Sequence, residues 1–459
     1  MIYIHILNGP PGTGKTNTLI ELIRQVCDHV SNHRVLVCTP SNSAADLIIE
    51  LLAKTYNKPN ILRLNAKSRD INTIVPSVYP YCNIRNNEIY TLTRNDLLSC
   101  TNIKQQRKYD IIVCTCNTAS TLYNIGISYT DFTHVFIDES GQATQPELMI
   151  PLILAGDNSS VVLCGDPKQL GPVVQDSLLQ RYGLQISLLE QLILTETNSN
   201  SVYYRNQQLR YNNKYCTLLR RNYRSHPSIL TVPNQLFYKN QLIPSVNVDE
   251  RSKLYQFELF TNKSIPIQFH CAAGKEDREA DSASWFNIDE VLHTMNYVKQ
   301  LLLQYKNITI NDIGVITPYK KQIKKLKQLA EHYGYNTVPG VHNKKPCLMI
   351  GTVELFQGNE KSIVIISTVR SQINYVAKYD LPYRIGFLHE PKRINVALTR
   401  AKYAMIIIGN ANVLSIDTNW RTLIEYCIEN NAYTGVEYIQ PPNMQAIDQL
   451  QIYGATNHQ

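Results

Sequence analysis

Residues 9–16 read GPPGTGKT and follow the apolar run 2–7. This pattern is that of a Walker A phosphate loop, in which glycines let backbone N–H groups close around a phosphate chain. Lys15 can reach the β- and γ-phosphates, and the Thr16 hydroxyl can face Mg²⁺. The run 2–7 indicates a buried strand, and apolar residues recur at helical spacing after the loop, so the phosphates are expected at a helix N-terminus. The predicted nucleotide-binding residues of the loop are Gly9, Pro10, Pro11, Gly12, Thr13, Gly14, Lys15 and Thr16.

Composition sets the broad class of the chain. Its 459 residues are 44% hydrophobic, enough for two or three cores. No apolar run approaches the roughly 20 residues that span a bilayer, and no basic leader precedes the first run, so we expect neither a membrane span nor a signal peptide. The 11 cysteines are scattered through apolar runs, which is typical of reduced core thiols. The net charge of +8 suits a polyanionic partner but is ordinary at this size.

A second strand–loop–helix unit follows the first. Residues 35–38 predict a strand, and TPSNS at 39–43 leads into a helical pattern. Ser and Asn at a helix start are usually caps, although the same N–H groups could hold a nucleic-acid phosphate. The irregular stretch 65–108 indicates an inserted subdomain. Its basic residues indicate either solvated surface or the lining of a channel for a phosphate backbone. The basic residues in or beside this stretch are Arg63, Lys67, Arg69, Arg85, Arg94, Lys104, Arg107 and Lys108.

Two later strands end in polar residues. DESGQ at 138–142 follows the apolar run 134–137. In a chain with a Walker A loop, Asp138 can hold the Mg²⁺ coordination sphere and Glu139 can polarise the attacking water. A strand-end acidic pair without catalytic work is the alternative. The run 161–164 is followed by GDPKQLGP, which is expected to place Gln169 beside the γ-phosphate.

The second half predicts another α/β domain after a polar junction at 176–215. Apolar runs at 313–316, 348–353, 363–369 and 405–408 alternate with helical patterns that include 289–305 and 322–332. Residues 245–286 look irregular. In RRNYRSHP, Arg224 can neutralise charge on the γ-phosphate and Tyr223 can stack on a base. Arg400, before the run 405–408, is a second candidate for such an arginine finger.

The polar stretches form an ordered series. GPPGTGKT, TPSNSAAD, DESGQ, GDPKQLGPV, RRNYRSHP, GTVELFQGNE and RINVALTRAK together resemble the motif series of a superfamily 1 helicase. GDPKQLGPV, NYRSHP, FQGNE and NVALTRAK resemble the up-frameshift-like 1B group. SRDINTIVPSVYPYCN, GKEDREADSASWFN, IISTVRS and NAYTG resemble its Armitage or silencing-defective branch. The resemblance covers residues 2–435.

The resemblance implies an α/β fold of two RecA-like P-loop NTPase domains, with parallel sheets flanked by helices. We expect the first domain at 1–175 with an insertion at about 65–108, a junction at 176–215, the second domain at 216–439 and a disordered tail at 440–459. The family carries a glutamine motif upstream of the first strand, and this sequence starts at that strand. We therefore expect a fragment or a minimal helicase, with weak selectivity among the four nucleotides.

The resemblance also implies an activity. The implied activity is that of an ATP-dependent RNA helicase or translocase, which is expected to move 5′ to 3′ on single-stranded RNA and to couple hydrolysis to lobe closure and to remodelling of duplexes or ribonucleoproteins. We expect a cytoplasmic monomer, present in ribonucleoprotein granules, with silencing or ribonucleoprotein proteins as partners. The cofactors are ATP and Mg²⁺, and Thr16 and Asp138 hold the metal.

Residue roles follow from the same resemblance. The catalytic group is Lys15, Asp138, Glu139 and Gln169, with Arg224 and Arg400 as fingers. Tyr223 stacks on adenine and Glu360 binds the ribose. The residues implied to contact the nucleic-acid backbone are Pro40, Ser41, Asn42, Thr115 and Thr352.

Two other functions stay open from the sequence. One is a 1B helicase that acts on DNA, and the other is a non-catalytic RNA clamp or silencing scaffold. The intact set Lys15, Asp138, Glu139, Gln169 and Arg400 argues against the scaffold. A nuclear location also stays open.

Overall fold

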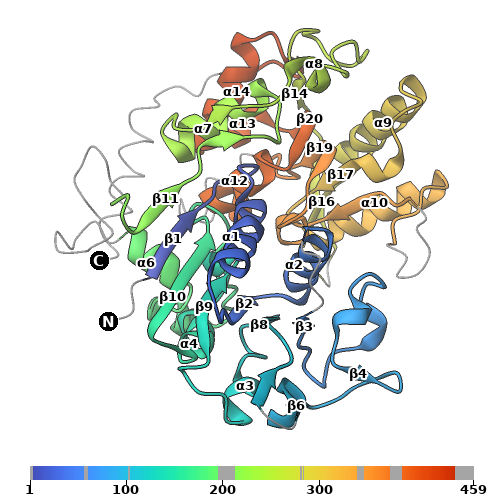
Figure 1. Ribbon diagram of the computed structural model, residues 1–459. Helices are drawn as coiled ribbons and strands as arrows, with labels where there is room; N and C mark the ends of the chain where they lie inside the picture. Colours follow the sequence, from blue (N-terminus) through green and yellow to red (C-terminus); the bar gives the residue numbers. More distant parts are fainter. Residues whose placement is uncertain are drawn as a thin grey trace. The chain divides into compact units, whose positions relative to one another are not determined.

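The computed structural model describes residues 4–55, 60–101, 104–194, 212–279, 282, 284–338, 346–372 and 385–439. The chain divides into two compact units, Met1–Arg220 and Arg221–Gln459. Each unit is built on a parallel sheet (Figure 1). The tail expected at 440–459 lies outside the described residues.

The first unit contains a seven-stranded sheet in the order β11-β1-β10-β9-β2-β8-β3. All its strand pairs are parallel. Five strands overlap apolar runs of the sequence, including β8, which overlaps the run predicted at 110–116, whereas the three-residue edge strands β3 and β11 were not predicted, because so few residues carry little periodicity. The bounds are β1 Ile4–Asn8, β2 Val35–Thr39, β3 Ile61–Arg63, β8 Ile111–Thr115, β9 Phe132–Ile137, β10 Ala155–Gly165 and β11 Cys216–Leu218.

Helices cover both faces of this sheet. The apolar stripes of α1 (Lys15–His29) and α2 (Asn42–Thr55) pack on one face, where Ile23 and Ile48 join the core. The opposite face packs against α3 (Ser120–Asn124), α4 (Gln145–Leu152) and α6 (Leu188–Leu194). A further short helix, α5, spans Ser177–Arg181. Because both faces are covered, the central strands β2 and β8 are apolar up to their last residues, Thr39 and Thr115.

The predicted insertion lies between β3 and β8. It consists of short elements: 3-10 turns and two small antiparallel pairs. The bounds are η1 Ile71–Thr73, η2 Tyr79–Tyr81, β4 Ile84–Arg85, β5 Glu88–Ile89, η3 Arg94–Leu97, β6 Leu98–Thr101 and β7 Lys104–Arg107.

The second unit contains a six-stranded sheet in the order β18-β17-β19-β20-β14-β21. Its pairs are all parallel, and α9 and α10 pack on one face. The strand bounds are β14 Ile267–Cys271, β17 Ile313–Ile316, β18 Met349–Gly351, β19 Lys361–Ser367, β20 Ala401–Gly409 and β21 Tyr433–Gly435. The helices are α7 Pro227–Tyr238, α8 Val248–Arg251, α9 Ile288–Gln304, α10 Lys320–His332, α12 Pro391–Leu398, α13 Ala411–Leu414 and α14 Thr418–Glu429. Smaller elements are β12 Arg221–Asn222, β13 Ile243–Pro244, β15 Glu276–Arg278, β16 Trp285–Asn287, η4 Ser140–Gln142, η5 Ile310–Asp312, η6 Val353–Phe356 and η8 Gly386–His389.

Two boundaries differ from the sequence prediction. The stretch 245–286, expected to be irregular, contains β14, which lies between β20 and β21 inside the sheet. Residues 216–220, expected in the second domain, belong to the first unit, because β11 pairs with β1 through the register Ile6↔Cys216. Both differences arise from pairing with distant strands, which local periodicity does not report.

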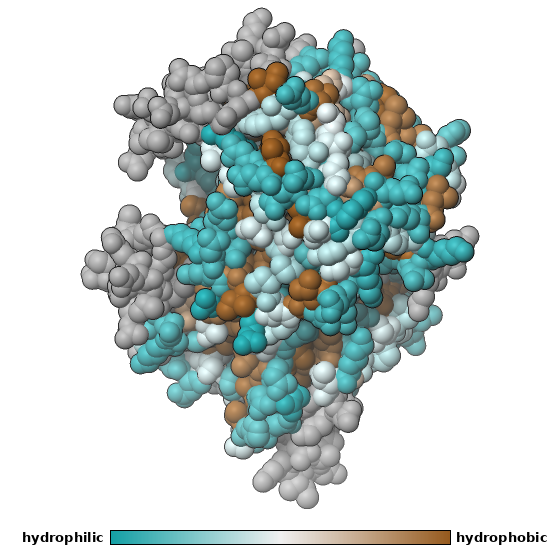
Figure 2. Space-filling view, turned by 90° about the horizontal axis from the view of Figure 1, so that it is seen from above, coloured by the Kyte–Doolittle hydropathy of each residue, from teal (hydrophilic) through white to brown (hydrophobic). Residues whose placement is uncertain are grey.

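The surface is that of a largely hydrophilic protein. Figure 2 shows hydrophilic residues over most of one face and hydrophobic residues in separate small groups. Within the described residues, no helix combines the length and hydropathy needed to cross a bilayer. Ten cysteines with described side chains are free and eight of them are buried, in agreement with the prediction of core thiols.

Candidate active site

The phosphate loop connects β1 to α1. Gly9 N donates to Gly165 O at 2.9 Å, which fixes the loop to the end of β10. A Cβ on Gly9 would lie 2.7 Å from the Lys15 Cβ, so only glycine fits where the loop passes this side chain. Gly14 has φ 79° and precedes the first helical residue, Lys15. The first N–H groups of a helix have no intrahelical acceptor, and the helix dipole favours an anion there, so this loop fits a phosphate chain.

An acidic pair at the end of β9 contacts the loop. Lys15 Nζ lies 2.6 Å from Glu139 Oε1 and 3.8 Å from Asp138 Oδ1. Thr16 Oγ1 donates to Asp138 Oδ2 at 3.2 Å. These groups follow two strands of one parallel sheet, β1 and β9, with β10 between them, and the carboxyl ends of all three strands lie at the same end of the sheet. The structure therefore brings together the four residues that the sequence assigned to phosphate, metal and water.

Charge and burial oppose each other in this cluster. Burial alone would lower the pKa of Lys15, but the carboxylates of Glu139 and Asp138 outweigh it and the pKa is raised. Burial raises the pKa of Asp138, and the charge of Lys15 works against that rise. Two carboxylates facing one ammonium leave an excess of negative charge. A hydroxyl and a carboxylate are hard oxygen ligands, so Thr16 and Asp138 fit Mg²⁺.

Glu139 has a strained backbone. Its φ of 53° and ψ of 32° are left-handed, which costs a non-glycine residue about 1–3 kcal/mol. Glu139 N donates to Asp138 Oδ1 at 2.9 Å, and Gln142 Nε2 donates to Glu139 Oε2 at 2.6 Å. The carboxylate is thus held from two sides, by Lys15 and by Gln142. Sequence reasoning quoted Gln142 within DESGQ but gave it no role; the one signal was its position three residues after the glutamate.

Gln169 lies in the turn that follows β10, the strand between β1 and β9. Its Nε2 donates to Asp166 Oδ2 at 3.0 Å, and Lys168 N donates to Asp166 Oδ1 at 2.9 Å. Asp166 is buried and organises this turn. Asp166 was not predicted to be a site residue. The sequence did offer a signal, because an Asp side chain often accepts a hydrogen bond from the backbone N–H two residues later and so forms a turn.

In the second unit, Glu360 lies between two cations. Arg224 Nε is 2.6 Å from Glu360 Oε2, and Lys402 Nζ is 2.5 Å from Glu360 Oε1. Burial alone would raise the pKa of Glu360, but Arg224 and Lys402 outweigh it and lower the pKa. Lys402 was not predicted, although it belongs to RINVALTRAK. Tyr223, next to Arg224, is 53% exposed, as a ring that accepts a stacked base must be.

Arg400 and Thr352 have different surroundings in this unit. Arg400 lies between α12 and β20, is buried, and donates from Nε to Val396 O at 3.1 Å. Arg224 Nη1 donates to Thr399 O at 3.0 Å, so both candidate fingers contact one turn. Thr352 follows β18 and immediately precedes η6.

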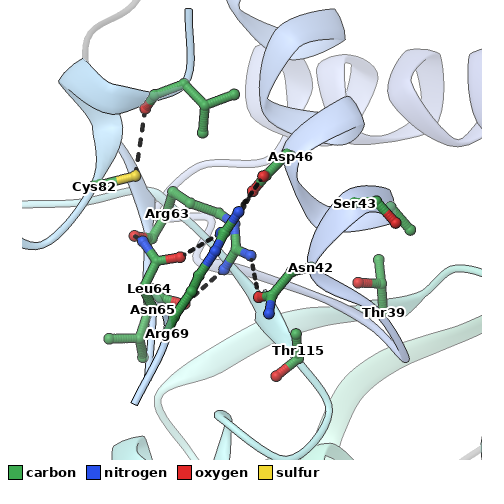
Figure 3. Close-up of polar contacts among 12 residues, drawn as sticks. Thr39, Asn42, Ser43, Asp46, Arg63, Leu64, Asn65, Arg69, Cys82 and Thr115 are labelled. Carbon is green, nitrogen blue, oxygen red and sulfur yellow. Dashed lines mark hydrogen bonds and ion pairs between the residues drawn. The ribbon is translucent and has the colours of Figure 1, made fainter. Parts of the chain in front are cut away.

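The candidate nucleic-acid contacts of the first unit lie at the ends of β2, which neighbours β9 in the sheet, and of β8, which lies on the other side of β2. Thr115 is in register with Thr39, the residue before Pro40. Ser41 Oγ accepts from Ala44 N at 3.3 Å, which confirms that a residue of this turn caps α2. Ser41, Asn42 and Ser43 are exposed. Figure 3 shows the side chains of Thr39, Asn42, Ser43 and Thr115 near one another.

Comparison with known proteins gives a consistent family. Residues 2–88 and 104–177 match one family described as AAA domain, and residues 184–412 match a second with the same description. "Putative helicase mov-10-B.1" of Danio rerio is 38% identical over 443 residues, which are 94% of this chain and 42% of that protein. "RNA helicase Mov10l1" of Mus musculus is 40% identical over 96% of this chain and 35% of its own length. "Probable RNA helicase armi" of Drosophila melanogaster is 35% identical over 95% of this chain and 37% of its own length.

The chain thus spans about two-fifths of the length of the curated relatives it matches. The matched part contains both parallel sheets and every motif of the series. The chain belongs to the superfamily 1B helicases of the up-frameshift-like group, in the Armitage branch.

Proposed function

We propose that this chain is the ATP-hydrolysing motor of an RNA helicase. The observation that carries the proposal is the cluster in which Lys15 Nζ lies 2.6 Å from Glu139 and Thr16 donates to Asp138 at 3.2 Å. It combines a phosphate-binding loop, a metal-binding pair and a general base. Two relatives in which this region is 35–40% identical are named RNA helicases, which supports RNA as the polymer.

The residues divide the work of hydrolysis. A bound Mg²⁺ would neutralise charge on the β- and γ-phosphates, and Thr16 and Asp138 are the residues to hold it. Phosphate oxygens would compete with Glu139 for Lys15, since both are anions within reach of one ammonium. Once Lys15 binds phosphate, the Glu139 carboxylate, still oriented by Gln142, can accept a proton from the attacking water.

The proposed polymer ligand is single-stranded RNA, with translocation 5′ to 3′ as in the family. In the first unit, Pro40, Ser41 and Asn42 follow β2, the strand next to β9 and its acidic pair, and Thr115 ends β8, one strand farther away. Hydroxyls, an amide and backbone N–H groups bind phosphate without reading bases. This arrangement supports movement along RNA that is independent of sequence and linked to nucleotide turnover. Remodelling of ribonucleoproteins, including those of RNA silencing, is the proposed use.

We also propose a cytoplasmic location. Eight buried free thiols suit a reducing compartment. Fractionation of cells that express the tagged chain should place it with cytoplasmic ribonucleoprotein. A purely nuclear signal would contradict this part of the proposal.

Phosphate release measured alone, with poly(U) and with oligo(dT) tests the function. We expect hydrolysis of ATP that poly(U) stimulates more than oligo(dT), with Glu139→Gln as the inactive control. Equal stimulation by oligo(dT) would indicate a DNA helicase. Absence of hydrolysis in the wild-type chain with RNA would overturn the motor and favour a clamp or scaffold.

A further inference from the structure

A buried ionic cluster lies beside the N-terminal turn of α2 (Figure 3). Asp46 Oδ1 accepts from Arg63 Nε at 2.9 Å, and Asp46 Oδ2 accepts from Arg69 Nη2 at 2.5 Å. The side chains are 0% exposed for Arg63 and 6% for Arg69 and Asp46. These two arginines were expected on solvated surface or along a channel, and the fold instead buries both against one carboxylate.

Stability alone does not explain why two arginines and one aspartate are buried together. Two guanidinium groups face one carboxylate, so the cluster keeps a net positive charge inside the protein. The desolvation of buried ion pairs usually cancels most of their attraction, and such pairs contribute more to geometry than to stability. Arg69 Nη1 also donates to Asn65 Oδ1 at 2.6 Å, and Arg63 Nη1 donates to Leu64 O at 2.7 Å. The guanidinium of Arg63 is therefore fixed in position and direction.

The third nitrogen of Arg63 contacts a candidate RNA-binding residue. Arg63 Nη2 donates to Asn42 Oδ1 at 2.8 Å. Asn42 and Asp46 are four residues apart on α2, so one guanidinium spans one helical turn and contacts both. Because Ser41 is the residue that caps the helix, the Asn42 side chain is not engaged in capping.

The direction of the Asn42 amide follows from chemistry. Arginine has only donors, so the amide must present its oxygen to Arg63 and its NH₂ group to the other side. Figure 3 shows that the amide nitrogen of Asn42 points away from Arg63, to the side of Thr115. Within the described part of the chain, no acceptor is recorded for this nitrogen, and the residue is exposed.

We propose that Arg63 is a positioning residue for RNA binding: it fixes the Asn42 amide so that the N–H donors of Nδ2 are presented to phosphate oxygens of the RNA backbone, while Asp46, itself bound by Arg69, holds Arg63 in place. This inference rests on the proposed function. It adds a role for β3, whose last residue is Arg63, and for the insertion, whose first loop contains Arg69. The net charge of the cluster, one helical turn behind the amide, also favours an anion at this position.

A double-mutant cycle tests the route through Asn42. The affinity of the full chain for labelled oligo(U) is measured by fluorescence anisotropy for wild type, Asn42→Ala, Arg63→Met and the double variant. Loss of a hydrogen bond to a charged group predicts that each single change weakens binding about tenfold. If Arg63 acts through Asn42, the double variant should also lose about tenfold. A loss near a hundredfold, or full affinity in Arg63→Met, would overturn the inference.

A second variant keeps the test valid if Arg63→Met fails to fold. Asn42→Asp lies on the surface, keeps an acceptor for Arg63 and removes both donors. It should bind oligo(U) more weakly than Asn42→Ala, since the remaining carboxylate oxygen repels phosphate, and affinity equal to wild type would refute the inference. Arg24→Met, which removes a charge from an exposed ion pair on α1, is the matched control and should bind as wild type does. If the wild-type chain binds no RNA, the proposed function falls as well; if it binds and the cycle is additive, only this inference falls.

Discussion

At the residue scale, the site depends on which anion Lys15 contacts. Lys15 contacts Glu139 at 2.6 Å, and in the proposed mechanism a phosphate chain competes for this ammonium, so that Glu139 acts as a base only when Lys15 releases it. Its left-handed backbone fixes the carboxylate between Lys15 and Gln142. Strain of this kind is common at catalytic positions, because the surrounding structure must hold the group where the reaction needs it.

Lys15 and Glu139 should therefore fail in different ways. Lys15→Ala removes a phosphate ligand and should weaken nucleotide binding. Glu139→Gln keeps the shape and should preserve binding while it lowers kcat by roughly 10²–10⁴-fold. Titration with a fluorescent nucleotide and steady-state phosphate release separate the two effects. Equal hydrolysis by wild type and Glu139→Gln would remove Glu139 from the mechanism.

Arg224 carries the corresponding prediction for the second unit. An arginine that stabilises charge on the transferring phosphoryl group contributes roughly a thousandfold or more to kcat. Arg224→Ala should show this loss, whereas Arg278→Ala, an exposed arginine on β15, should not. A reduction of less than about threefold in Arg224→Ala would assign Arg224 to the ion pair with Glu360 alone.

At the element scale, buried polar anchors fix helices to strand ends. Glu290 on α9 is fully buried and accepts from Ser367 Oγ at 2.6 Å, at the end of β19. Its carboxylate also accepts from Val369 N at 2.9 and 2.8 Å, and Val369 has φ 73°, unusual for a β-branched residue. Burial raises the pKa of Glu290 to about 8.

This shift makes stability depend on pH. The folded state keeps the proton on Glu290 up to about pH 8, whereas the ordinary value of 4.5 applies in the unfolded chain. Between these values the folded state binds more protons, so the free energy of unfolding falls as pH rises. Glu290→Gln should lose this slope, which is at most about 1.4 kcal/mol per pH unit. Thermal unfolding of both proteins at pH 5, 6.5 and 8 checks the difference, and parallel pH profiles would contradict it.

At the scale of the whole molecule, the charge of +8 is spread over 45 basic and 37 acidic residues. Part of the basic excess is internal, since Arg63 and Arg69 lie in the buried cluster. The remainder is available to attract a polyanion from solution, while hydroxyls and amides make the short-range contacts.

RNA affinity should therefore depend on salt and hardly at all on sequence. Each phosphate contact on a single strand contributes about −0.7 to the slope of log K against log salt, so three contacts predict a loss of roughly tenfold or more for a fourfold rise in salt. Anisotropy titrations with oligo(U) and a mixed-sequence oligonucleotide at several salt concentrations measure both properties. A flat salt dependence, or strong preference for one short sequence, would contradict the prediction.

The sequence by itself determined which residues form the candidate active site. The phosphate loop, DESGQ and GDPKQ are contiguous stretches, and each follows an apolar run, so local spacing alone places Lys15, Asp138 and Gln169 in the segments that follow strands. Parallel strands then bring those ends to one edge, which makes their proximity predictable before any coordinates are known.

Only the tertiary structure decided how distant charges pair. Arg63 and Arg69 look like surface residues in the sequence, and their burial against Asp46 depends on β3 pairing with β8. The same holds for Lys402 beside Glu360, and for β14, whose place inside the second sheet depends on β20 and β21. The physical reason is the same in each case. Burial and ion pairing depend on which segments meet in space, whereas periodicity shows only which face of a segment is apolar and not which other segment covers that face.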